Sequence, residues 1–192
     1  MQVWVGLGNP GPQYALNRHN VGFMALDTLA EVHGFGPVQK KFQGWVQDGR
    51  IGGTRVILLK PATFMNESGR AVGEALRFYK LGSDALTVFH DELDLAPFKV
   101  KVKVGGGTAG HNGLRSIDQH CGADFRRVRL GIGHPGHKDR VTGYVLGNYA
   151  KAEGDDLATM LGAVARAAPW LAQANDARFM SDVALIQQDQ TP

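Results

Sequence analysis

Short apolar runs alternate along the chain with amphipathic segments. Apolar runs with the length and β-branched content of strands occur at 2–6, 42–51, 55–60, 85–90 and 127–132, and the second and third form a hairpin around Gly52-Gly53. Apolar residues at three- and four-residue spacing predict helices after Asn20, after Asn66, at 113–121, at 151–172 and at 176–187. The alternation predicts an α/β fold: one domain, residues 1–192, with a mixed central β-sheet flanked by helices.

Lysine alternates with valine in residues 99–104, directly before a glycine-rich loop that ends in Gly110-His-Asn-Gly113. Side chains two residues apart on a strand point the same way, so Lys99, Lys101 and Lys103 would form a row with gaps of about 6.6 Å. That spacing resembles the spacing of successive backbone phosphates, and the valines between the lysines would face a core. The alternative is a solvated edge strand that lysines protect from aggregation.

Composition is that of an ordinary globular protein of 192 residues. The N-terminus predicts a strand rather than a signal peptide, and no apolar run is long enough to cross a membrane, so we expect a cytoplasmic protein with no membrane segment. The single cysteine, Cys121, excludes an intramolecular disulfide and a thiolate zinc cluster, and we expect it to be a small core residue.

Positive charge is concentrated in one part of the sequence. The net charge is +3, but the segment from Lys99 to Arg140 holds nine Lys and Arg against three Asp and Glu, a local charge of +6 that leaves −3 for the remainder. A polarised basic surface on a nearly neutral protein favours an acidic partner such as nucleic acid.

Candidate chemistry lies just after the predicted strands. In α/β sheets, ligands bind where loops leave the carboxyl ends of the strands. Four segments occupy such positions: the turn at Asn9, the run 61–66, the pair His90-Asp91 and the loop 110–113. We expect them to converge on one pocket.

His19 and Asp91 are candidates for acid–base chemistry. His19 stands in a loop before the first helix, where an imidazole titrates near neutrality. If Asp91 orients the ring, His19 becomes a better general base for water. The alternatives remain open: His19 as a surface histidine, and Asp91 as a helix cap or turn residue.

Three asparagines lie in the same segments: Asn9, Asn66 and Asn112. A carboxamide donates and accepts hydrogen bonds while staying neutral, so the set suits an acyl substrate, with a donor for a developing oxyanion. Taken singly, Asn9 would begin a turn, Asn66 would cap a helix and Asn112 would adopt a left-handed conformation.

Other chemistries have weaker support. Gly6-x-Gly8-x-x-Gly11 matches a dinucleotide-binding pattern, but prolines bracket its third glycine and the acidic residue expected about 20 positions on lies within a helix. Histidines and carboxylates at 90–94 and 134–137 lack metal-ligand spacing, and no nucleophile elbow occurs. Activated water is the simplest nucleophile, with no metal and no cofactor.

A set of motifs resembles the bacterial-type peptidyl-tRNA hydrolases. The motifs occur in order over about 140 residues: Gly6-Leu-Gly-Asn-Pro-Gly11, Arg18-His-Asn-Val-Gly22, Lys60-Pro-Ala-Thr-Phe-Met-Asn66, His90-Asp-Glu-Leu-Asp-Leu95, Gly110-His-Asn-Gly113 and Gly131-Ile-Gly-His-Pro-Gly136. The resemblance implies a cytoplasmic, monomeric, metal-independent esterase without an obligate protein partner. It would cleave the ester bond between peptide and tRNA and so recycle tRNA after stalled translation.

The resemblance also implies roles for particular residues. His19 would be the general base and Asp91 the carboxylate that orients it, while Asn9 would distinguish N-blocked substrates from free aminoacyl-tRNA. The implied substrate-binding residues are Tyr14, Phe64, Met65, Asn66, His111 and Asn112, the last of which also stabilises the oxyanion. Lys103 and Arg129 would clamp the 5′ phosphate of tRNA.

The chain departs from the family pattern at three places. Asn17 replaces a common threonine, Phe98 a frequent glycine, and Thr108-Ala109 a more usual His-Gly pair.

Two other classes of protein are alternatives to the hydrolase: an RNA-binding module that uses the same basic region without catalysis, and a nicotinamide oxidoreductase that uses the first glycine turn.

Overall fold

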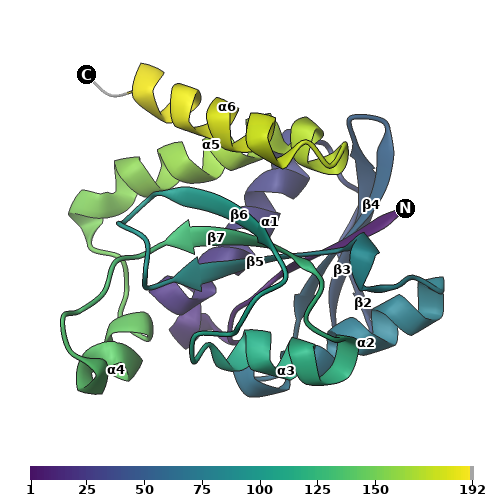
Figure 1. Cartoon of the computed structure of the whole chain (residues 1–192), viewed down its shortest axis with the longest axis horizontal. Helices are drawn as coiled ribbons and strands as arrows, with labels where there is room; N and C mark the ends of the chain where they lie inside the picture. Colours follow the sequence, from purple (N-terminus) through teal and green to yellow (C-terminus); the bar gives the residue numbers. More distant parts are fainter. Residues whose placement is uncertain (191–192) are drawn as a thin grey trace.

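The computed structural model describes residues 1–190 and contains a seven-stranded sheet with helices on both faces (Figure 1). The strand order is β2-β3-β4-β1-β5-β7-β6. The strands are β1 (Gln2–Gly6), β2 (Gln39–Lys41), β3 (Gly44–Ile51), β4 (Thr54–Pro61), β5 (Leu86–Glu92), β6 (Val100–Val104) and β7 (Arg126–Gly131). β1, β4, β5 and β7 run parallel, and β2, β3 and β6 pair antiparallel, so the predicted mixed α/β sheet is confirmed.

Two layers of helices cover the sheet. The helices are α1 (Val21–Val32), α2 (Ser68–Tyr79), α3 (Asn112–Cys121), α4 (Val141–Val145), α5 (Gly154–Ala172) and α6 (Asp176–Asp189). α1 and α5 pack on one face, with α6 beside α5 and against β6, whereas α2 and α3 pack together on the other face (Figure 1). No helix within 1–190 is both long and apolar enough to cross a bilayer.

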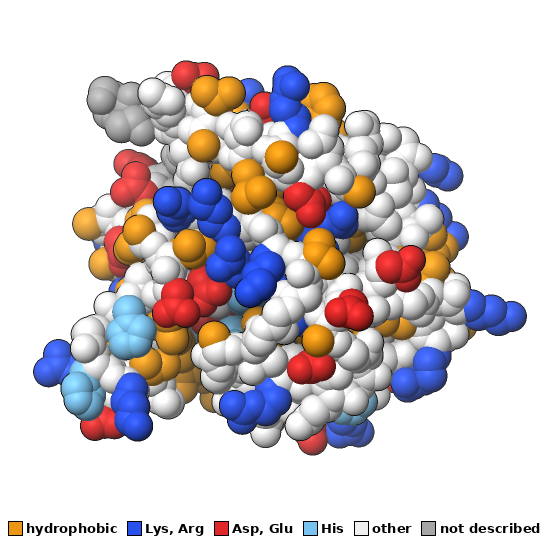
Figure 2. All heavy atoms as spheres, in the orientation of Figure 1, with side chains coloured by type: hydrophobic (Ala, Val, Ile, Leu, Met, Phe, Trp, Pro, Cys, Tyr) orange, Lys and Arg blue, Asp and Glu red, His pale blue; other side chains and the backbone are white. Residues whose placement is uncertain are grey.

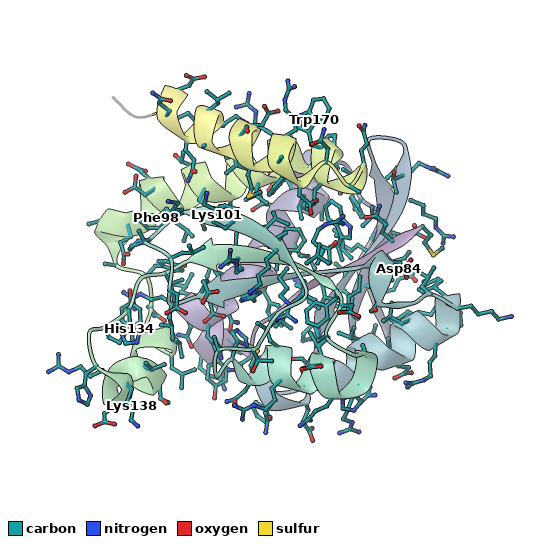
Figure 3. All side chains as sticks on the ribbon, in the orientation of Figure 1. Asp84, Phe98, Lys101, His134, Lys138 and Trp170 are labelled. Atoms are coloured by element: carbon teal, nitrogen blue, oxygen red, sulfur yellow. The ribbon has the colours of Figure 1, made fainter. Side chains whose placement is uncertain are left out.

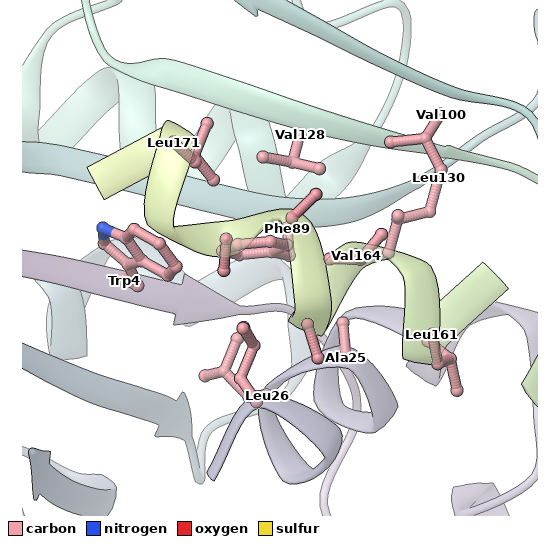
Figure 4. Close-up of a cluster of buried hydrophobic side chains, with 14 of the residues drawn as sticks. Trp4, Ala25, Leu26, Phe89, Val100, Val128, Leu130, Leu161, Val164 and Leu171 are labelled. Carbon is pink, nitrogen blue, oxygen red and sulfur yellow. The ribbon is translucent and has the colours of Figure 1, made fainter. Parts of the chain in front are cut away.

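Each face of the sheet has its own hydrophobic core. On one face Trp4, Phe89 and Val128 meet Leu26 of α1 and Val164 of α5 (Figure 4). On the other face, alternate strand residues such as Val3 and Val88 meet α2 and α3. Burial on both faces explains why the central strands are continuous apolar runs rather than alternating ones.

The lysine strand differs from its prediction. β6 begins at Val100, so Lys99 lies before the strand rather than in its row. Val100 is buried, but Val104 is 60% exposed because β6 is the edge strand and the core ends beneath its first half. The prediction that the valines between the lysines face a core is confirmed for Val100 and Val102, and Val104 lies beyond the core.

Two short elements were not predicted, and one predicted core residue lies near the surface. β2 consists of three polar residues, and α4 is a single helical turn, so neither has a hydrophobic period. Cys121, at the end of α3, is half-buried against the core on that face, and burial raises the pKa of its thiol to about 11. It therefore lies at the margin of the core.

Candidate active site

The four predicted segments meet at the carboxyl end of the parallel strands. The backbone amide of Met65, after β4, donates to Asn9 Oδ1, after β1, over 2.8 Å. Asp91, at the end of β5, contacts both His19, before α1, and His111, at the start of α3. The predicted convergence on one site is confirmed.

A glycine in the first turn of α1 allows His19 to reach this site. Gly22, in the first turn of α1, lies so close to β1 and β5 that an added Cβ would collide with the carbonyl oxygens of Phe89 and Leu7. The start of α1 therefore rests directly on the strand ends, and the turn that precedes it holds His19 over β5.

His19 and Asp91 form a buried pair. His19 Nδ1 lies 2.8 Å from Asp91 Oδ2, and the side chains are only 11% and 2% exposed. Burial acts to lower the pKa of His19, but the charge and hydrogen bond of Asp91 outweigh it, so the pKa is raised above the usual value. With Nδ1–H donating to the carboxylate, Nε2 is the nitrogen available to accept a proton from water.

Asp91 holds a second imidazole. His111 Nε2 lies 2.8 Å from Asp91 Oδ1, while His111 Nδ1 accepts from the backbone amides of Gly113 and Leu114 at the start of α3. Because Nδ1 is an acceptor there, the proton is on Nε2 and the donor to Asp91 is fixed. Burial alone would raise the pKa of Asp91, but the two histidines lower it well below its usual range.

This second contact of Asp91 was not predicted from the sequence. The weak signal that was present is the position of His111 directly before α3, where a side-chain acceptor is needed to cap the helix. A histidine that caps through Nδ1 must point Nε2–H elsewhere. Sequence alone does not identify Asp91 as its acceptor.

Asn9 has a fixed orientation. Asn20 Oδ1 accepts from the backbone amide of Asn9 and Asn20 Nδ2 donates to its carbonyl, both over 2.9 Å. The Asn9 side chain uses Oδ1 to accept from Met65. The Nδ2 group therefore remains as a donor for a ligand, and its position is set before any ligand binds.

Asn66 and Asn112 are exposed beside these residues. Asn66 lies in the 3₁₀ turn Met65–Glu67, where no side chain caps α2, and Asn112 is the first residue of α3. The prediction that Asn66 caps a helix is therefore wrong. The prediction of a left-handed conformation for Asn112 is also wrong, because the residues with positive φ in this loop are Ala109 and Gly110. Both carboxamides are accessible to a ligand.

Tyr14, Phe64 and Met65 surround the same loops. Phe64 is 61% exposed and Tyr14 half-buried, whereas Met65 is buried. The Met65 thioether packs where an added Cβ on Gly113 would collide with it, so it fills the space between the Asn66 turn and α3.

Basic side chains lie beside the site on β6 and β7. Lys101 pairs with Arg129 and Lys103 with Arg127 in the antiparallel register, so the four share one face of the sheet. Figure 2 shows Lys and Arg side chains gathered over this edge of the sheet, and Figure 3 locates Lys101 there. Lys103 is exposed and Arg129 half-buried, 3.9 Å from Glu92.

Arg127 has a structural role. It is almost fully buried and donates to the carbonyls of Gly107 and Ala123, which ties the glycine-rich loop to β7. Through Gly107 it anchors the loop that connects β6 to His111.

A metal ion is an alternative occupant of the site. Within 1–190, His19, Asp91 and His111 are the one group whose potential ligand atoms lie close enough together, within 4.8 Å. However, both nitrogens nearest the carboxylate lie at hydrogen-bond distance from it, and His111 Nδ1 is occupied by backbone amides. The arrangement fits a carboxylate that accepts hydrogen bonds from two N–H groups better than it fits a metal centre.

The dinucleotide alternative does not fit the fold. After β1 the glycine turn leads into the short 3₁₀ helix Pro12–Tyr14 rather than a long helix whose N-terminus binds pyrophosphate. Asn20 also occupies the turn through its two hydrogen bonds to Asn9.

The fold and the site define a class: a protein with a seven-stranded mixed α/β sheet that carries a carboxylate-held imidazole at the carboxyl end of its parallel strands. A family model for peptidyl-tRNA hydrolase matches residues 3–191. The chain is 79% identical over 188 residues to the peptidyl-tRNA hydrolase of Novosphingobium aromaticivorans, covering 98% of both proteins. It is 74% identical to that of Erythrobacter litoralis, covering 98% of this chain and all of the relative.

Solved structures agree. The crystal structure of peptidyl-tRNA hydrolase from Acinetobacter baumannii superposes with a TM-score of 0.89 at 41% identity, covering 95% of this chain and 94% of that one. The chain therefore belongs to the peptidyl-tRNA hydrolase family, and the prediction of family, enzyme class and fold is confirmed.

Proposed function

We propose that the protein cleaves the ester bond between peptide and tRNA, with His19 as the general base. Support comes from family membership and from one observation above all: a buried carboxylate that fixes the His19 ring and leaves Nε2 free. The whole chain, 1–192, would act as one catalytic domain, as a monomer in the cytoplasm, without a metal or an obligate protein partner.

The reaction begins with a water molecule between His19 Nε2 and the ester carbonyl. The imidazole takes a proton as the water oxygen bonds to the carbonyl carbon, and Asp91 stabilises the resulting imidazolium. The tetrahedral intermediate then expels the 3′ oxygen of the ribose, which receives that proton from His19. General-base catalysis of this kind contributes about 10²- to 10⁴-fold.

The asparagines bind the acyl group. Asn112 donates to the developing oxyanion, an interaction typically worth about 10²- to 10³-fold in turnover. Asn66 and the preset Nδ2 of Asn9 hold the peptide backbone, so a free aminoacyl ester, which lacks a blocked N-terminus, binds less well. This assignment is supported by the accessible carboxamides and by the bond that fixes Asn9.

The remaining residues bind tRNA and the 3′ end. Tyr14 and Phe64 offer exposed ring surface for the terminal nucleotide, and Met65 packs beneath them. His111 borders the acyl site while it holds Asp91. Lys103 and Arg129 clamp the 5′ phosphate, with Lys101 as a neighbouring cation.

Hydrolysis of N-acetyl-aminoacyl-tRNA tests the proposal, with and without a chelator. His19→Ala should lose most turnover, at least about 10²-fold, while binding tRNA nearly as well as the unchanged protein. Undiminished hydrolysis by this variant would refute the role of His19. Loss of activity in the chelator would refute metal-independent catalysis, and binding without any cleavage would favour the RNA-binding module.

A further inference from the structure

A cavity of about 210 Å³ lies next to Asn9, on the side away from Asp91. Asn9 and Asn20 form the wall nearest the site, and Trp45 of β3 and Lys60 of β4 lie beyond them. The remaining lining comes from the glycine turn and α1: Pro10, Gly11, Ala15, Phe23, Met24 and Asp27. None of the roles proposed above uses this space.

The lining favours an uncharged, bulky group. Phe23, Met24 and Trp45 provide apolar and aromatic surface. The two charged residues of the lining neutralise each other, because Lys60 Nζ lies 2.5 Å from Asp27 Oδ1. The cavity is smaller than the roughly 300–1,000 Å³ of typical small-molecule sites, and its size fits one large side chain.

Asn9 links the cavity to the proposed acyl site. Asn9 lines it and also presents Nδ2, which we assign to the peptide backbone, and Asn20 directly follows His19 in the chain. A peptide held at Asn9 therefore passes the mouth of the cavity.

The strand order sets the distance from Asp91 to the cavity, and this distance determines which residue of the peptide reaches it. Asp91 is on β5, and β4 and β3 are two and three strands away. With neighbouring strands about 4.8 Å apart, the cavity lies roughly 10–14 Å from Asp91. An extended peptide advances about 3.3–3.6 Å per residue, so its backbone lies about 7 Å from the ester at the second residue and about 10–11 Å at the third. A large side chain spans the remaining distance, so the second or third residue reaches the cavity and the first does not.

We infer that this cavity is a specificity subsite, which binds an aromatic or large apolar side chain of the peptide at the second or third residue from the ester. The inference rests on the proposed acyl site. It makes the enzyme selective among peptides by their sequence upstream of the ester-linked residue. Burial of an aromatic side chain in a partly open cavity gives a preference of about tenfold in kcat/KM.

The test compares N-acetyl-tripeptidyl-tRNA substrates that carry phenylalanine at the first, second or third residue from the ester, with glycine elsewhere. An all-glycine substrate is the reference. The unchanged protein should prefer phenylalanine at the second or third position by about tenfold, mainly through KM. If the all-glycine substrate is not cleaved, the proposed function itself fails, whatever the cavity does.

Two variants change the cavity in opposite ways. Trp45→Ala removes a wall, and Ala15→Phe fills the space from an exposed position where folding tolerates the change. Both should reduce the positional preference to about twofold or less, whereas Ala184→Phe on the outer face of α6 should keep it. A preference that is absent, or that survives both cavity variants, overturns the inference. Equal losses on all four substrates also overturn it, since they would indicate a cavity that serves tRNA or the catalytic groups.

Discussion

Replacing Asp91 with asparagine should put His19 into the wrong tautomer. The two imidazoles each donate one N–H to a different oxygen of Asp91, over 2.8 Å in both cases. A carboxamide has the same shape but a single oxygen. One histidine must therefore face the NH₂ group, and the structure indicates which one.

His111 cannot adapt to the amide. Its Nδ1 accepts from the amides of Gly113 and Leu114, so Nε2 must keep its proton and will take the single oxygen. The NH₂ group then faces His19, whose Nδ1 must become an acceptor, and the proton moves to Nε2. In that tautomer Nε2 has no lone pair to receive a proton from water, so Asp91→Asn should lose about 10³- to 10⁴-fold in turnover.

A second substitution separates this account from a general loss of charge. In Asp91→Asn combined with His111→Ala, nothing holds the amide oxygen, so the amide turns and gives it to His19. The double variant should therefore recover at least about tenfold over Asp91→Asn, although His111→Ala alone lowers activity and loses a helix cap worth about 1 kcal/mol.

Single-turnover hydrolysis of N-acetyl-aminoacyl-tRNA at saturating enzyme measures the chemical step in all four proteins. Circular dichroism and thermal unfolding show whether each variant is folded at the assay temperature. A double variant that is as slow as, or slower than, Asp91→Asn would refute the tautomer argument. The carboxylate would then act chiefly through its charge.

Three further predictions follow from other features of the molecule. Because Asp91 raises the pKa of His19 above its usual value near 6.5, kcat/KM should rise with pH through a midpoint above that value, and Asp91→Asn should lower the midpoint; an unshifted profile would contradict the pairing. Lys103→Ala or Arg129→Ala should weaken binding of full-length tRNA substrates, reduce the salt dependence by about one phosphate contact, and affect substrates without a 5′ phosphate less; equal effects on both would argue against the clamp. Ala109→Gly should raise the melting temperature by about 2–4 °C in calorimetry. Ala109 is exposed and has a φ of 47°, which costs about 1–2 kcal/mol for a side chain, and the larger conformational entropy of unfolded glycine offsets about 0.5–1 kcal/mol of that gain; an unchanged or lower value would show that the loop does not need that conformation.

Much of the fold could be predicted because its signals are local. The central strands are buried on both faces, so each appears in the sequence as a short apolar run bounded by turns. The edge elements lack such signals: β2 has no apolar residue, and α4 is too short for a helical period. Lys99 was placed in the strand because alternation continues through it, whereas pairing begins one residue later.

One part of the site could be predicted from the sequence: which segments come together, because the carboxyl ends of parallel strands meet at one edge of the sheet. That rule brings Asn9, His90-Asp91 and the 61–66 run together and makes a contact between Asp91 and His19 a reasonable expectation. It does not say how many donors one carboxylate receives. The bond to His111 depends on how α3 is capped and on where its start lies relative to β5, and neither is encoded in a local pattern.

The contact of Asp91 with His111 bears on the role that we propose for the carboxylate. A buried carboxylate with a single partner can rotate when that partner changes charge. Here the backbone of α3 fixes His111, and His111 fixes Asp91, so the second oxygen is held in place for His19 before a proton arrives. In the mechanism we propose, the counterion of the His19 imidazolium is already oriented, so the site requires no reorganisation. We therefore assign His111 a positioning role in the proposed reaction, through the orientation of Asp91.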